Sequence, residues 1–216
     1  MNATVGAPVV AFVGAESTGK TSLTHALSQI FMARGVAAVV VPEALRLFCD
    51  QHGRTPARHE QAQIAAEQTR LIDQAKMSCE LVLADTTALM TAVYSDHVFG
   101  DLSLYMQAEQ DHAQVSLTLL TSLDLAWLPD GLQRDGEHVR KPVDNLIRAA
   151  LHRIGQPFNL VGGQGGDRVE HALSSIDYML DTSERLRRAA SSPRWRWLCD
   201  KCDDGDCEQH WLPRSD

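Results

Sequence analysis

Short apolar runs along the chain alternate with longer segments in which apolar residues recur at helical spacing. A short run bounded by turn residues is typical of a buried strand, and the longer pattern is typical of an amphipathic helix. The predicted strands occupy residues 9–13, 37–41, 81–84, 115–120 and 157–161. The predicted helices occupy residues 22–31, 58–77, 88–98, 102–112, 141–154 and 168–188. This alternation predicts an α/β fold in which helices cover both faces of a five-stranded parallel sheet. The glycine-rich residues 162–166 are predicted to form a loop.

A phosphate-binding motif lies between the first predicted strand and the helix that follows it. Residues 14–21 read GAESTGKT and match the pattern G-x-x-x-x-G-K-[ST] at every position. A strand before the motif and a helix after it form the context that a phosphate loop requires. The motif therefore predicts a P-loop fold of the nucleoside- and nucleotide-kinase type that binds a nucleoside triphosphate.

Each residue type in the motif has a physical role. Gly14 and Gly19 can adopt backbone angles closed to other residues, so that backbone N–H groups turn toward phosphate oxygens at a helix N-terminus. Lys20 is expected to reach the β- and γ-phosphates, and the Thr21 hydroxyl to bind Mg²⁺. The guanine-reading motif N-K-x-D is absent from the sequence, which favours ATP over GTP. The predicted nucleotide-binding residues are Gly14, Glu16, Ser17, Thr18, Gly19, Lys20, Thr21 and Ser22.

Two acidic residues follow predicted strands at the sheet edge where such folds bind ligands. Asp85 comes directly after residues 81–84 and suits the second acidic position of a P-loop enzyme, where it orients Mg²⁺. The alternative is an ordinary helix cap shared with the two threonines that follow it. Glu43 comes after the second strand and is expected to hold or deprotonate an acceptor hydroxyl. Its alternative role is an acid in the first turn of a helix, where the helix dipole favours negative charge.

Residues 127–140 follow the fourth predicted strand and are rich in turn formers. Phosphoryl transfer requires cations over the migrating group, often on a segment that closes over the site. Arg134 and Arg140 are the candidates for this role. The alternative is a solvated loop whose arginines pair with neighbouring acids.

Four segments of the chain resemble the ribosylnicotinamide kinase domain of the bacterial NAD-biosynthesis regulator NadR and its relatives. The first two matching features are the start of the phosphate loop, with its Glu16, and the pair Glu43 and Arg46 at the end of the second strand. The other two are Asp85 with the threonines after it and the segment WLPDGLQR at residues 127–134. These features keep the order of the family from about residue 8 to about residue 175. The resemblance implies a kinase that uses ATP to phosphorylate a ribosyl hydroxyl of a nucleoside similar to nicotinamide riboside. It also implies substrate contacts by Glu43, Arg46, Asp85 and Trp127.

The sequence predicts two parts, a kinase-like domain of residues 1–190 and a C-terminal tail of residues 191–216. The tail carries a separate signal. Cysteine and histidine there have the spacing C-x₂-C-x₄-C-x₂-H. Three thiolates and an imidazole can form a closed tetrahedral Zn²⁺ site that holds a short segment in shape. The predicted zinc ligands are Cys199, Cys202, Cys207 and His210. The alternative is a tail with reduced, exposed thiols. Cys49 and Cys79 are interpreted as small core residues.

Composition narrows the function further. The formal net charge of −8 disfavours a nucleic acid or an anionic membrane as a partner, and no apolar run is long enough to span a bilayer. The N-terminus lacks the features of a signal peptide, so we expect a cytoplasmic protein.

Besides the magnesium-dependent small-molecule kinase that we favour, two other classes of function stay open. One is a nucleotide-switched regulatory ATPase that acts through a protein partner. The other is a scaffold that binds a protein through the zinc tail.

Overall fold

The structure is a computed structural model that describes residues 6–128 and 136–191, with side chains described up to residue 184. Contacts divide the chain into two units, residues 1–179 and 180–216. The fold below is that of the first unit, and the last helix continues from it into the second. The domain boundary predicted at residue 190 stays a prediction.

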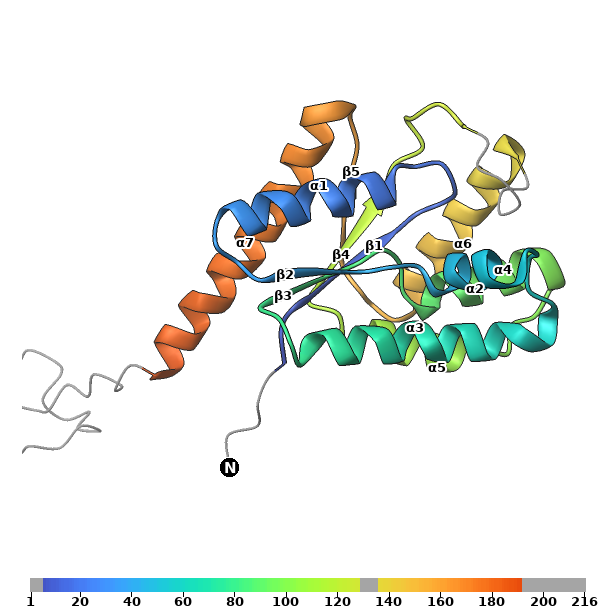
Figure 1. The fold of residues 1–216 in the computed structure, drawn as a ribbon, viewed down its shortest axis with the longest axis horizontal. Helices are drawn as coiled ribbons and strands as arrows, with labels where there is room; N and C mark the ends of the chain where they lie inside the picture. The colour runs from blue at the N-terminus through green and yellow to red at the C-terminus, as the bar shows by residue number, and fades with distance from the viewer. Residues whose placement is uncertain (1–5, 129–135, 192–216) are drawn as a thin grey trace, which may run out of the picture. The chain divides into compact units, whose positions relative to one another are not determined.

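All strand pairs in the sheet are parallel. Each strand lies within two residues of its predicted position, in a run rich in Val, Leu and Ala. The strands are β1 (Val9–Val13), β2 (Ala38–Val41), β3 (Leu81–Ala84), β4 (Leu117–Thr121) and β5 (Phe158–Val161). Their order across the sheet is β2-β3-β1-β4-β5, with β1 in the centre (Figure 1). The predicted α/β fold with five parallel strands is therefore confirmed.

Helices connect the strands. They are α1 (Lys20–Ala33), α2 (Ala44–His52), the short 3₁₀ helix η1 (Arg58–Glu60), α3 (Gln61–Lys76), α4 (Ala88–Phe99), α5 (Tyr105–His112), the 3₁₀ helix η3 (Glu137–Val139), α6 (Arg140–Arg153) and α7 (Gly165–Ser191). Helix α2 was not predicted, and residues 58–77 form η1 and α3 rather than one helix. Helix α7 begins inside the glycine-rich stretch that we predicted as a loop, so the loop is shorter than expected.

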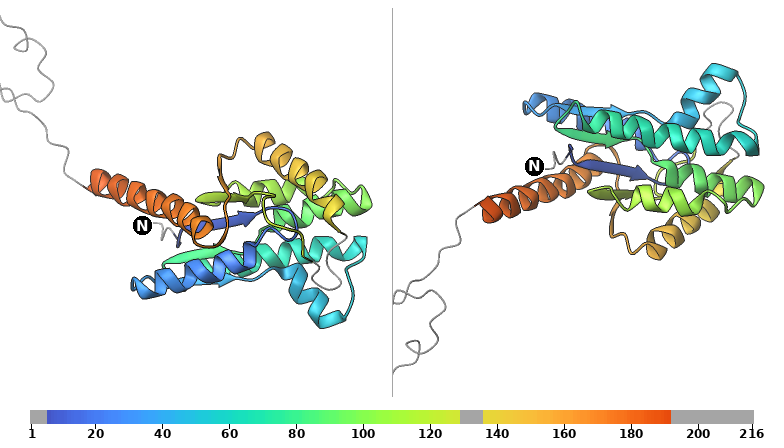
Figure 2. Two further views of the ribbon diagram at one scale, coloured as in Figure 1. Left: turned by 90° about the horizontal axis from the view of Figure 1, so that it is seen from above. Right: turned by 90° about the horizontal axis from the view of Figure 1, so that it is seen from below.

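The sheet is covered on both faces because its strands alternate their side chains between two cores. Val9 and Val13 of β1 lie on one face, where their clusters include residues of α3, α4 and α6. Phe12 points to the opposite face and is fully buried. Helix α1 and the first turns of α7 cover that face, linked by an ion pair of 2.7 Å between Arg34 and Asp177 (Figures 1 and 2).

The strand order determines where a site can form. Because β1 lies between β3 and β4, the segments that leave these three strands meet at one edge of the sheet. Ligands usually bind at the carboxyl edge of a parallel sheet, between neighbouring strands whose following segments run to opposite faces of the sheet. Within residues 6–128 and 136–191, no helix combines the length and apolar character needed to cross a membrane.

Candidate active site

The phosphate loop follows β1 and requires glycine at two positions. Gly14 has φ +154°, and a Cβ added there would lie 2.0 Å from the Thr121 hydroxyl oxygen at the end of β4. Gly19 has φ +77° and immediately precedes α1 in the left-handed conformation. Side chains other than glycine rarely adopt these angles, which explains the glycines of the motif.

A buried hydroxyl pair supports the loop from beneath. The Thr18 hydroxyl donates to the Ala15 carbonyl oxygen at 2.7 Å and lies 2.7 Å from the hydroxyl of Thr121. Both threonines are fully buried. These contacts tie the turn of the loop to β4 and hold its backbone in one conformation.

Arg168 in the first turns of α7 holds the same loop from a distant part of the chain. Its Nη2 donates to the Thr18 carbonyl oxygen at 2.9 Å, and its Nη1 donates to Asp124 Oδ1 and to the Gly163 carbonyl oxygen, both at 2.8 Å. Partial burial acts to raise the pKa of Asp124, but hydrogen bonds from Arg168, Ser122 and the Gly163 N–H outweigh it and lower that pKa to about 2. The sequence analysis missed this arginine.

Lys20 and Thr21 begin α1 with their polar groups turned to the loop. Lys20 Nζ donates to the carbonyl oxygens of Gly14 at 2.8 Å and Ala15 at 2.9 Å. The Thr21 hydroxyl donates to Asp85 Oδ2 at 2.6 Å, and Asp85 is only 4% exposed. A hydroxyl and a carboxylate oxygen beside a phosphate loop are the hard oxygen ligands that Mg²⁺ takes, so these residues fit the metal.

Backbone strain is concentrated at this site. Among the described residues, Ser17 with φ +57° and Thr86 with φ +101° are the non-glycine residues with positive φ. Ser17 is in the phosphate loop, and Thr86 directly follows Asp85. A positive φ costs of order 1–3 kcal/mol for such residues, so the surrounding contacts must over-determine both positions. For Ser17 the contact is Leu128, whose backbone N–H donates to the serine hydroxyl at 2.7 Å.

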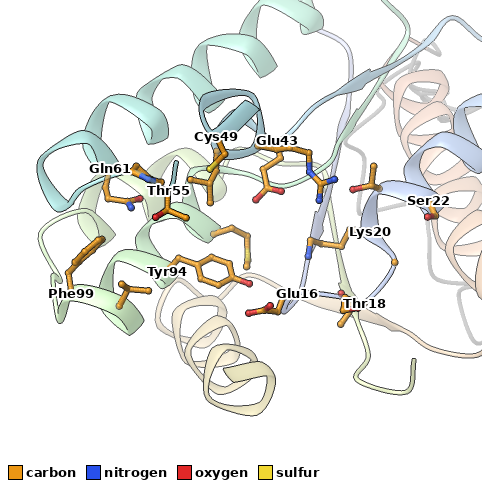
Figure 3. Close-up of a pocket in the computed structure, with 18 residues that line it drawn as sticks. Glu16, Thr18, Lys20, Ser22, Glu43, Cys49, Thr55, Gln61, Tyr94 and Phe99 are labelled. Carbon is orange, nitrogen blue, oxygen red and sulfur yellow. The ribbon is translucent and has the colours of Figure 1, made fainter. Parts of the chain in front are cut away.

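A pocket of about 460 Å³ opens beside the loop (Figure 3). Glu16 and residues 17–22 line it on one side, and α2 and α4 contribute other walls. The structure therefore brings the predicted Glu43 and Arg46 into the same cavity as the phosphate loop. The lining residues are Glu16, Ser17, Thr18, Gly19, Lys20, Thr21, Ser22, Glu43, Leu45, Arg46, Cys49, Thr55, Pro56, Gln61, Met90, Tyr94, Val98 and Phe99.

A model of one protein family matches the chain across this whole arrangement. The model, AAA_28, is described as an AAA domain and matches residues 9–168. The chain belongs to this AAA domain family. The match runs from the first residue of β1 to Arg168, the residue that anchors the phosphate loop.

Solved structures with this AAA domain's fold include two of the NadR protein. The structure with NAD and AMP-PNP is 19% identical, with a TM-score of 0.65, over 81% of this chain and 50% of that one. The structure with NR is 20% identical, with a TM-score of 0.68, over 80% of this chain and 51% of that one. This chain thus spans about half the length of the NadR chains. A deoxyadenosine kinase from M. mycoides is 14% identical, with a TM-score of 0.53, over 79% and 99% of the two chains. A search of curated proteins found no match.

These likenesses confirm the predicted P-loop kinase fold of the AAA domain. The roles of its individual side chains stay predictions, including those of Glu43 and Arg46. Glu43 immediately precedes α2, near the helix N-terminus where its alternative role as a helix-start acid would place it. Its side chain makes no capping hydrogen bond there.

Other predicted site residues of the AAA domain lie away from the pocket or outside the described residues. Trp127 does not line the pocket. Arg140 is 5% exposed at the start of α6, where Nη1 donates to the Leu125 carbonyl oxygen at 2.8 Å. Arg134 lies outside the described residues, as do the four predicted zinc ligands, Cys199, Cys202, Cys207 and His210. Residues 6–128 and 136–191 contain no cluster of three or more His, Cys, Asp or Glu side chains arranged for a metal.

Sequence reasoning missed the far walls of the pocket. Tyr94 and Phe99 come from α4, and Gln61 is the first residue of α3. Gln61 and Tyr94 are in segments predicted as helices, and Phe99 directly follows one, but the sequence did not indicate which helix faces turn to the site. Cys49, interpreted as a core residue, is 4% exposed and also lines the pocket. The pKa of its thiol is raised mainly by burial and, to a smaller extent, by the negative charges of Glu43 and Asp50.

Proposed function

We propose that this protein is a kinase that transfers the γ-phosphoryl group of ATP, with Mg²⁺, to a hydroxyl of a nucleoside-like acceptor. Nicotinamide riboside is the first candidate acceptor. The observation that carries the proposal is that Lys20 and Glu43 line the same pocket of about 460 Å³. A phosphate loop beside a pocket of ligand size, with an acid in its wall, has the parts required for transfer to a small molecule.

The donor side of the reaction is assigned to the loop. Its backbone N–H groups and Lys20 would bind the phosphates, and Thr21 and Asp85 would hold Mg²⁺. When bound, Mg²⁺ neutralises charge that develops on the phosphate oxygens. Arg140, predicted to add positive charge, does not line the pocket, so it is not assigned to the donor side.

The acceptor side is assigned to Glu43 and Arg46. The Glu43 carboxylate would accept the proton of the acceptor hydroxyl while the hydroxyl oxygen forms a bond to the γ-phosphorus. The bond between that phosphorus and the β–γ bridging oxygen breaks, and ADP leaves. Arg46 would bind the acceptor or its new phosphate. Such a step depends on positioning and on charge stabilisation more than on covalent chemistry by the protein.

The decisive experiment measures ATP turnover by the full chain with Mg²⁺, with and without a nucleoside panel headed by nicotinamide riboside. ADP formation that rises sharply with one nucleoside, with a phosphorylated product identified by mass, is the expected result. Slow ADP formation that is indifferent to every nucleoside would refute the kinase and favour the regulatory ATPase with a protein partner.

The zinc tail is a second proposal, and it concerns residues outside the described part of the chain. We propose that Cys199, Cys202, Cys207 and His210 bind one structural Zn²⁺ and that the tail offers a surface for a protein partner. The spacing of the four residues supports the proposal.

A further inference from the structure

Gln68 of α3 is a buried amide whose two polar atoms both have partners. The residue is only 1% exposed and does not line the pocket. Its Oε1 accepts from the Ala44 N–H at 2.7 Å. Its Nε2 donates to the Pro42 carbonyl oxygen at 3.3 Å and to the Thr86 carbonyl oxygen at 3.5 Å. Because only the amide oxygen can accept and only the amide nitrogen can donate, these three partners fix the orientation of the group.

Two of these contacts hold the backbone on both sides of Glu43. The Pro42 carbonyl belongs to the peptide unit before Glu43, and the Ala44 N–H belongs to the peptide unit after it. Peptide units are planar, so holding both of them restricts the two backbone angles of the residue between them. Gln68 therefore sets the direction in which the Glu43 side chain leaves the backbone. Figure 3 shows its carboxylate directed into the pocket.

The contact with Ala44 also serves the start of α2. The first N–H groups of a helix have no partner within the helix and often bind a capping side chain. Glu43 occupies the N-cap position, but its side chain makes no capping hydrogen bond. Gln68 binds the Ala44 N–H instead. One N–H of the helix start is thus satisfied from α3, while the Glu43 side chain lines the pocket.

The third contact holds the turn that follows Asp85. Thr86 has φ +101°, an angle that persists only where surrounding contacts hold it, and Gln68 binds its carbonyl oxygen. The Asp85 N–H donates to the Val41 carbonyl oxygen at 2.9 Å, which joins the ends of β2 and β3 at the same place. The Asp85 carboxylate, which accepts from the Thr21 hydroxyl, leaves the chain from this turn.

We propose that Gln68 is a positioning residue that holds the Glu43 carboxylate in place relative to the Mg²⁺ site at Asp85. This inference rests on the proposed function, which assigns the two acids to the acceptor and to the metal. Group transfer slows steeply when reacting groups are misplaced by about 1 Å, so a link between the two acids serves the reaction. The three hydrogen bonds of Gln68 lie outside the phosphate loop. Its loss should therefore spare the binding of the nucleotide phosphates themselves.

The test compares Gln68→Met, which removes the amide and keeps a similar volume, with Thr69→Val in the full chain. Thr69 is the next residue of α3, and its hydroxyl donates to Asp111 Oδ2 at 2.8 Å, outside the pocket. Both variants lose hydrogen bonds and should be less stable than wild type. At a temperature where circular dichroism shows both to be folded, Gln68→Met should lower kcat roughly tenfold or more, and Thr69→Val should keep the wild-type kcat. Equal values of kcat in the two variants would overturn the proposal.

A double-mutant cycle tests whether Gln68 acts through Glu43. Adding Gln68→Met to Glu43→Gln should lower kcat by a clearly smaller factor than Gln68→Met does in wild type, because the carboxylate that it positions is already absent. The same factor in both backgrounds would overturn the proposal. Gln68→Glu, which keeps the shape and the acceptor oxygen but lacks the amide nitrogen, replaces Gln68→Met if the latter does not fold, with the same expected results.

Nucleotide binding keeps the test independent of turnover. Calorimetric titration of the non-hydrolysable ATP analogue AMP-PNP in EDTA should give the same Kd for wild type and Gln68→Met. The gain in affinity on adding Mg²⁺ should be smaller in Gln68→Met, because Asp85 is displaced. This difference in a wild type that phosphorylates no nucleoside would refute the kinase and support the role of Gln68. An equal gain in both proteins would overturn that role, even if a nucleoside is phosphorylated.

Discussion

His112 makes the stability of this protein dependent on pH, and the size of the effect can be worked out from its surroundings. The residue ends α5 and is 1% exposed. Its Nδ1 lies 2.8 Å from the Thr87 hydroxyl oxygen, and its Nε2 lies 3.0 Å from that of Thr118. Burial lowers the pKa of His112 from 6.5 to about 4, because the imidazolium loses its hydration there.

The unfolded chain therefore binds this proton more readily than the folded protein. The contribution to stability is fully present above pH 6.5 and is lost as the pH falls toward 4. With one pKa unit equivalent to about 1.4 kcal/mol, the free energy of unfolding should fall by about 2 kcal/mol between pH 7.5 and pH 5 from this residue alone.

Urea denaturation followed by circular dichroism at pH 7.5, 6.5, 5.5 and 5.0 measures this loss. Wild type should show the decline, and His112→Asn, which cannot titrate, should show a nearly flat profile from a lower starting stability. His25→Asn changes an exposed histidine of α1 and should keep the wild-type slope. A His112→Asn profile as steep as that of wild type would refute the reasoning.

Three further predictions concern the phosphate loop and the tail. Lys20→Ala should abolish ATP turnover with an unchanged melting curve, whereas Lys141→Ala at an exposed position should keep it; normal turnover in Lys20→Ala would disprove the site. Arg168→Met should lower the free energy of unfolding by ~2 kcal/mol or more and raise the KM for ATP, because Thr18 loses its anchor. Its control, Arg34→Met, breaks an exposed ion pair and should cost less than about 1 kcal/mol; equal losses would contradict the argument. Cys202→Ser should lower the zinc content without changing nucleotide affinity, and wild type free of zinc by elemental analysis would end the tail hypothesis.

The parts of the protein that local sequence determines were predictable. The apolar runs located every strand, and the motif located the loop between β1 and α1 because the motif needs glycine at Gly14 and Gly19 wherever it occurs. Helix α2 escaped prediction because it has only nine residues, and only Ala44 and Cys49 among them are buried. So short an element depends on tertiary packing more than on its own pattern.

The residues that support the loop and complete the pocket were not predictable from the sequence, because they depend on strand order and on which face of a helix turns inward. Thr121 approaches Gly14 only because β4 pairs with β1. Gln61 has the same residue type as the exposed Gln63, two positions away. Spacing along one sequence cannot distinguish them until the packing of α3 is known.

The hydrogen bond from Arg168 to the Thr18 carbonyl oxygen joins residues 150 positions apart. A ribosome therefore makes the phosphate loop 150 residues before the arginine that anchors it, so the loop acquires this support late. A nascent chain that ends before residue 168 contains the whole motif but lacks this anchor. The loop can therefore reach its final conformation only after the first turns of α7 have been synthesised.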